Sequence, residues 1–189
     1  KYIRAYKEKN YLKMEIVVNE YIEQISSYDE VNMGLIRKES SYNKSDFFLY
    51  SIIFYLISFL LLGIFWISSL NIVKKIAFIT LLAGLGYHGY GLLTRMIIMQ
   101  RPPVSTLYES IIFVGFIGVL FSTIFERFRK DGIGILLASI VGIILHFIGF
   151  GYEDDGDTLG VLVAVLNSNF WLATHVTTIT IGYGATAVA

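Results

Sequence analysis

The chain has 189 residues, of which 55% are hydrophobic and 16% are charged. Soluble domains carry about a quarter charged residues, so this composition excludes an ordinary soluble domain and indicates an integral membrane protein. Basic and acidic side chains number 15 each, and this balance does not point to a nucleic-acid partner; none is expected. Cysteine is absent, which excludes disulfides and thiolate ligands within this chain.

The first part of the chain differs in composition from the rest. Residues 1–46 hold eight basic and eight acidic side chains, and a weak helical pattern covers Tyr11–Tyr28. We expect this part to be an extracytoplasmic segment, the end of a soluble domain or a linker, before a transmembrane domain at 47–189. The chain starts without methionine and stops within an apolar stretch, so we expect a piece of a longer protein, with the transmembrane domain incomplete at its C-terminus.

Five apolar stretches are long enough to cross a bilayer, whose core of about 30 Å needs roughly 20 helical residues. They lie at 47–70, 76–99, 107–125, 132–151 and 170–189. A further apolar stretch, 158–168, is too short to cross, and we expect it at the membrane interface. The predicted fold is therefore an all-α, polytopic bundle of about five transmembrane helices.

Short loops rich in lysine and arginine stay on the cytoplasmic side. The two basic turns, expected at Asn71–Lys75 and Glu126–Asp131, therefore lie inside, and the N-terminal segment, the loop after 99 and the acidic loop after 151 lie outside. Arg95 and Arg101 are then on the outer side, against the simple rule. Such exceptions favour an anionic ligand there.

The second stretch carries polar residues at helical spacing. Gly84, His88, Gly91 and Arg95 fall at i, i+4, i+7 and i+11, so they share one helix face. Small residues on such a face allow close approach of a neighbouring helix or a flat ligand. Arg95 is near one end, and an arginine so placed commonly reaches to the interface. His88, near the middle of the helix, is a candidate binding residue.

The loop QRPPVSTLYES, residues 100–110, predicts the start of the third helix. Two prolines end the preceding helix, because proline lacks an N–H and restricts the residue before it. Thr106 and Glu109 have the spacing of a capping box. A structural role is therefore sufficient to explain Glu109.

The last stretch contains a single ionisable residue, His175, after the helix-capping sequence NSN at 167–169. An ionisable residue inside a membrane helix is a functional candidate, because burying it costs free energy. A neutral histidine hydrogen-bonded to a neighbouring helix explains it equally well, and the spacing leaves both interpretations open.

Two passages together resemble the CcsA/ResC family, the membrane partners in System II cytochrome c biogenesis. QRPPVSTLYESIIFVG is similar to the family's Pro-Ser-x-Leu-Tyr-Glu-Ser loop, and the upstream GLLTRM to its Gly-Leu-x-x-Arg-Trp approach, with Met96 in place of tryptophan. NSNFWLATHVTTITIGYGA is similar to the family's Gln-Ser-x-Trp-Leu-x-x-His-Val segment. YNKSDFF, residues 42–48, looks like the start of the CcsA portion in fused CcsB–CcsA chains. The resemblance runs from about Tyr42 to the end.

The resemblance implies a haem-handling function in the bacterial inner membrane. The family brings haem b to the outer face and attaches it to the Cys-x-x-Cys-His motif of an apocytochrome c. Its expected partners are a CcsB/ResB-like subunit or fused domain, the apocytochrome and the lipid bilayer. The family's tryptophan-rich loop and second external histidine would follow Ala189.

The resemblance also implies a set of site residues. His175 matches the first external histidine and is the expected axial ligand of haem iron, with Trp171 one turn away as a wall for the ring. Arg95 and Arg101 are weaker expectations as propionate partners. His88 is a still weaker candidate, because neither it nor His146 matches a histidine of the family.

The chain is therefore expected to be part of a cytochrome c haem lyase and inactive alone, with catalysis by positioning of haem and thiols. No catalytic residue is assigned. Two other functions remain open: a haem exporter without lyase activity, and a structural membrane subunit in which all three histidines are packing residues.

Overall fold

A computed structural model of the chain describes residues 11–26, 33–100, 102, 104, 106–152 and 170–186. Every element among these residues is a helix. The contacts divide the chain into two compact units, residues 1–44 and 45–189. The first unit contains α2 (Tyr11–Ser26), with largely exposed side chains, and α3 (Met33–Asn43).

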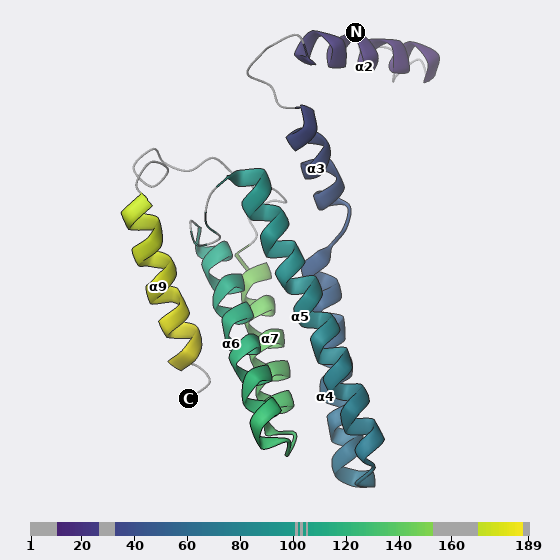
Figure 1. The fold of residues 1–189 in the computed structure, drawn as a ribbon. Helices are drawn as coiled ribbons and strands as arrows, with labels where there is room; N and C mark the ends of the chain where they lie inside the picture. Colours follow the sequence, from purple (N-terminus) through teal and green to yellow (C-terminus); the bar gives the residue numbers. More distant parts are fainter. Residues whose placement is uncertain are drawn as a thin grey trace. The chain divides into compact units, whose positions relative to one another are not determined.

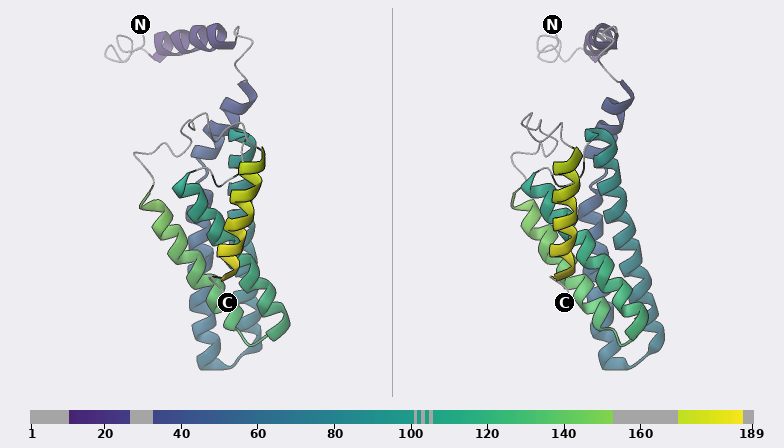
Figure 2. Two further views of the ribbon diagram at one scale, coloured as in Figure 1. Left: turned by 90° about the vertical axis from the view of Figure 1, so that its left-hand side faces the viewer. Right: turned by 60° about the vertical axis from the view of Figure 1, so that its left-hand side comes forward.

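The second unit is a helical bundle. It comprises α4 (Phe47–Ser68), α5 (Asn71–Met99), α6 (Leu107–Arg129), α7 (Ile133–Phe150) and α9 (Phe170–Thr186). Helices α4 and α5 form one packed pair, and α6 and α7 form another (Figures 1 and 2). The two pairs meet where α4 contacts α7, and α9 packs against α6. The interfacial stretch expected at 158–168 lies outside the described residues.

Four of the described helices are long and apolar enough to cross a membrane: α4 to α7. The chain therefore has the all-helical architecture of a membrane bundle, as its composition predicts. Helix α9 occupies the fifth predicted span, and 17 of its residues are described. That α9 crosses the membrane, and on which side each loop lies, stay predictions.

The centre of the bundle is built around Tyr55. Its ring is fully buried, and a Cβ added at Gly84 of α5 or at Gly142 of α7 would lie 2.8 or 2.6 Å from the two opposite edges of that ring. Glycine at both positions therefore allows α5 and α7 to close on α4. The surrounding apolar core consists of Leu62, Ala77, Leu81, Val119, Ile135 and Ala138.

The first basic turn differs from the prediction. The expected turn at Asn71–Lys75 is wrong, because α5 begins at Asn71 and the chain turns at Ser69 and Leu70. Ser69 adopts a left-handed conformation, and its N–H donates to the carbonyl of Phe65. Lysines fit in the first turn of α5 because their long side chains carry the charge away from the helix axis.

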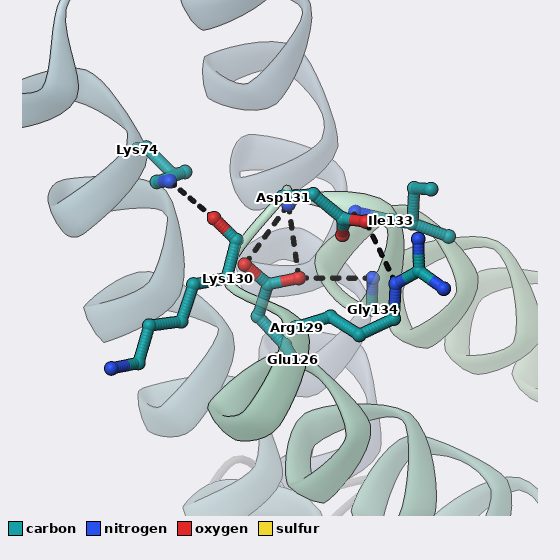
Figure 3. Close-up of polar contacts among 8 residues, drawn as sticks. Lys74, Glu126, Arg129, Lys130, Asp131, Ile133 and Gly134 are labelled. Atoms are coloured by element: carbon teal, nitrogen blue, oxygen red, sulfur yellow. Dashed lines mark hydrogen bonds and ion pairs between the residues drawn. The ribbon is translucent and has the colours of Figure 1, made fainter.

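The second basic turn is also shorter than predicted. Helix α6 continues to Arg129, so the expected turn at Glu126–Asp131 is reduced to Lys130–Gly132. Two physical causes extend α6. Arginines in its last turn face the negative end of the helix dipole. The buried carboxylate of Glu126 accepts the N–H groups of Gly132 and Gly134, at 3.0 Å each, and so caps α7 (Figure 3).

The two basic turns lie at the same end of the bundle. Lys74 at the start of α5 donates its ammonium group to the carbonyl of Lys130 at 2.6 Å (Figure 3). Beside them, Arg129 pairs with Asp131 at 2.9 Å. The N–H of Ile133, which bonds to the Asp131 carboxylate, and then the Arg129 guanidinium hold the pKa of Asp131 below its usual value. This carboxylate therefore stays ionised at neutral pH.

We expect Gly134→Ala to destabilise the fold. A Cβ at this position would lie 2.5 Å from Glu126 Cβ and 2.6 Å from the carbonyl oxygen of Ser122. Backbone atoms cannot move aside as a flexible side chain can, so α6 and α7 must separate, at a cost of about 2 kcal/mol or more. A lower thermal unfolding midpoint in detergent would show this effect.

Gly63→Ala is the matched control. A Cβ there meets nothing within 4 Å. Because alanine favours a helix over glycine by about 0.5–1 kcal/mol, this variant should unfold at the same temperature or higher. Equal midpoints for the two variants would contradict the close contact between α6 and α7.

Candidate functional site

His175, the predicted iron ligand, is exposed on the second turn of α9. Its ring makes no hydrogen bond with the residues that the structure describes. Nearby, the hydroxyl of Thr178 donates to the carbonyl of Thr174, so it is occupied by its own helix. Both ring nitrogens of His175 are thus available to a ligand from outside the bundle.

The other two histidines lie together in the core. His88 of α5 and His146 of α7 are both fully buried, with ring centres 4.2 Å apart. Phe48 and Tyr55 of α4 present their rings to both imidazoles at centre distances of 5.8 to 6.2 Å. The ring centre of Phe116 on α6 also lies 5.3 Å from that of His88, so four helices contribute to one aromatic cluster, which we did not predict from the sequence.

Hydrogen bonds define the tautomers of the pair. Nε2 of His88 lies 3.1 Å from the carbonyl of Ile112, which can only accept, so this nitrogen carries the proton. Its Nδ1 accepts from the hydroxyl of Tyr55 at 3.1 Å. Nδ1 of His146 donates to the carbonyl of Gly142 at 2.8 Å, and Nε2 of His146 has no hydrogen-bond partner within the described part of the chain.

This arrangement does not hold an iron porphyrin between the two rings. Two imidazoles that bind one iron from opposite sides have ring centres about 6 Å apart. This distance is the sum of two metal–nitrogen bonds of about 2 Å each and, in each ring, the distance from the nitrogen to the ring centre. The observed separation is 4.2 Å, and the partners of His88 use both of its nitrogens. The geometry thus favours packing roles for His88 and His146. Among the described residues, no group of three or more His, Cys, Asp or Glu side chains could hold a metal ion.

A sequence signal for the pair exists. Both histidines occur in the pattern Gly-x-x-x-His-x-x-Gly, at 84–91 and at 142–149. In each case the first glycine contacts Tyr55, and all residues named in the two patterns are buried. The repeated pattern indicates that each histidine points into the bundle on the same face as its glycines.

Arg95 is buried rather than extended to the interface, so the expectation that its side chain reaches the surface is wrong. Its guanidinium lies 3.2 Å from a carboxylate oxygen of Glu109, and both side chains are 2% exposed. The guanidinium also lies over the ring of Tyr108, 5.1 Å from its centre. The cause is the position of Glu109, whose negative charge lies inside the bundle and attracts the cation inward.

Glu109 has two roles at once. Its second carboxylate oxygen accepts the N–H of Thr106, while the Thr106 hydroxyl accepts the N–H of Glu109, which confirms the predicted capping box. Arg95, one of the two predicted propionate partners, is thus already paired with a carboxylate in this structure. The structure does not describe Arg101 or the side chain of Trp171, so their predicted roles at the haem stay predictions.

The sequence is similar to part of a known protein. No protein-family model matches the sequence, and no solved structure matches it. Protein NrfI of Wolinella succinogenes is 34% identical over 97 residues, which are 51% of this chain but 10% of NrfI. This similarity agrees at a coarse level with the cytochrome c biogenesis relationship that the motifs indicate.

We expect Glu109→Gln to destabilise the protein although glutamine also completes a capping box. The change removes the negative charge that faces the buried guanidinium of Arg95, and removing one partner of a buried pair costs about 3 kcal/mol. The thermal unfolding midpoint should fall. Arg95→Gln/Glu109→Gln should recover part of the loss, because no buried charge then lacks its counter-charge.

Thr106→Ala separates the cap from the ion pair. It removes the hydroxyl that caps α6 and leaves both charges in place, so its cost should be near 1 kcal/mol. A Glu109→Gln variant as stable as the unsubstituted protein would show that the buried ion pair contributes nothing and that Glu109 acts through the cap alone.

Proposed function

We propose that this chain is part of a membrane protein of cytochrome c maturation, in which His175 holds haem iron at the outer side of the bundle. The haem would then be attached through thioether bonds to the Cys-x-x-Cys-His motif of an apocytochrome c. The support comes from the similarity to NrfI, from the family motifs and from the exposure of His175.

The contrast among the three histidines is the observation that carries this proposal. His88 and His146 are fully buried, and His175 is exposed. A haem ring cannot reach the buried pair without displacing the helices around Tyr55, whereas it can approach α9 from the surface. His175 is thus the histidine that can meet both a haem and a protein substrate.

The placement of α9 agrees with an outer site. Helix α9 runs alongside α6 and in the same direction, so it begins at the end opposite the two basic turns (Figure 2). A Cβ added at Gly184 would lie 2.6 Å from Ile117, so the C-terminal part of α9 is in close contact with α6. If the basic turns are cytoplasmic, His175 faces the outer compartment.

The protein groups have a limited chemical task in this reaction. Neutral imidazole binds haem iron through one nitrogen, and the other nitrogen needs a hydrogen-bond acceptor. Bound haem supplies the vinyl groups that react with the thiols. The bundle would hold the haem close to the incoming motif and exclude water, which accelerates bond formation by positioning.

We expect His175→Ala in the full-length protein to lose haem, seen as loss of the Soret band of the purified protein. Cytochrome c maturation should fail in cells that carry this variant. His175→Gly with added imidazole should regain part of the Soret band, because the free base can occupy the vacated coordination position.

Ile181→Ala is the control for this experiment. Ile181 is exposed on the same helix, but six residues further and therefore on another face. This variant should keep its haem. An unchanged Soret band in His175→Ala would refute the proposed ligand. Loss of the Soret band in this variant without any maturation defect would favour a haem exporter.

A further inference from the structure

The basic end of the bundle contains a pocket that the proposed haem chemistry does not use. Its volume is about 560 Å³. Residues of helix α5, the end of α6, the turn after it and the start of α7 line this open pocket. The lining residues are Asn71, Lys74, Lys75, Phe78, Ile79, Glu126, Arg127, Lys130 and Ile135.

The charges around this pocket do not balance. Four of its lining residues are basic and one is acidic: Lys74, Lys75, Arg127 and Lys130 against Glu126. The carboxylate of Glu126 is buried and already accepts the N–H groups of Gly132 and Gly134. It therefore caps α7 rather than neutralising the lysines.

Three of the four cations are free for a ligand. Lys74 donates to the carbonyl of Lys130 and lies 5.2 Å from the centre of the Phe65 ring. Within the described residues, the side chains of Lys75, Arg127 and Lys130 form no ion pair or hydrogen bond. Figure 3 shows Lys130 directed away from Glu126 on the side of Lys74. The positive charge therefore gathers from three separate elements without an acidic partner.

The deeper wall of the pocket is apolar. Phe78 and Ile79 follow Lys74 and Lys75 by one turn of α5, and Ile135 faces them from α7. Along α5, the lining of the pocket thus changes within one helical turn from ammonium groups to hydrocarbon side chains. A ligand that fits this gradient has an anionic head and an apolar tail.

We propose that this pocket binds an anionic phospholipid of the adjoining leaflet, with its phosphate among Lys75, Arg127 and Lys130 and its acyl chain along Phe78 and Ile79. The ends of transmembrane helices lie at the depth of lipid phosphates, and basic pockets between such helices suit anionic headgroups. A free phosphate ion would use the cations but not the apolar wall.

Arg127 and Arg129 provide a matched pair for the test. They are two residues apart on α6 and carry the same charge, but Arg127 lines the pocket and Arg129 pairs with Asp131 outside it. Arg127→Gln should weaken lipid binding about fivefold, the effect of one basic group near an anionic surface. Arg129→Gln should change it little, and Arg127→Lys should retain most of it.

The measurement is native mass spectrometry of the full-length protein, released from detergent with equal amounts of phosphatidylglycerol and phosphatidylcholine of the same acyl chains. We expect retention of phosphatidylglycerol that inorganic phosphate at millimolar concentration does not displace. Monodisperse elution and unchanged circular dichroism establish that each variant is folded.

Three results would overturn the proposal. Equal losses in Arg127→Gln and Arg129→Gln would indicate a general attraction of the basic end for anionic lipid. Displacement by inorganic phosphate would assign the cations to a small anion. Replacement of the bound lipid by stoichiometric haem, lost again in Arg127→Gln, would assign the pocket to a propionate-bearing ligand.

Discussion

Tyr55 is the centre of the hydrogen bonds that join the helices in the dry interior of the bundle. Its hydroxyl donates to His88, and His88 in turn donates to the carbonyl of Ile112 on α6. An unmade hydrogen bond in this environment costs about 1–3 kcal/mol, so these contacts fix the register of α4, α5 and α6. The glycines on either side of the Tyr55 ring bring α5 and α7 within reach.

Much of the local structure follows from spacing along the sequence. The predicted common face of Gly84, His88, Gly91 and Arg95 on α5 is confirmed, because all four residues are buried. The capping box at Thr106 is also present. These features depend on residues within a few helical turns of each other, where the period of 3.6 residues determines which side chains meet.

Contacts between distant helices could not be derived in this way. His88 meets His146 across 58 positions of sequence, and Arg95 turns inward because Glu109 happens to start the next helix at the same depth. Periodicity states which face of a helix is buried but not which helix covers it. The predicted bounds of the second basic turn were wrong for a related reason. Charge alone places Glu126 in the turn, whereas Glu126 lies on α6 and its carboxylate caps α7.

The Glu126 cap has a consequence for how this protein reaches the membrane. The N-cap of helix α7 is Gly132, which has no side chain to accept the first N–H groups of the helix, so the carboxylate of Glu126 on α6 serves this purpose. If α7 left the translocon alone, its first N–H groups and the carboxylate on α6 would each reach the membrane interface without this partner, and a buried polar group without its hydrogen bond costs free energy. We therefore expect α6 and α7 to partition into the bilayer as a preformed hairpin, so that the unit of membrane insertion here is a pair of helices.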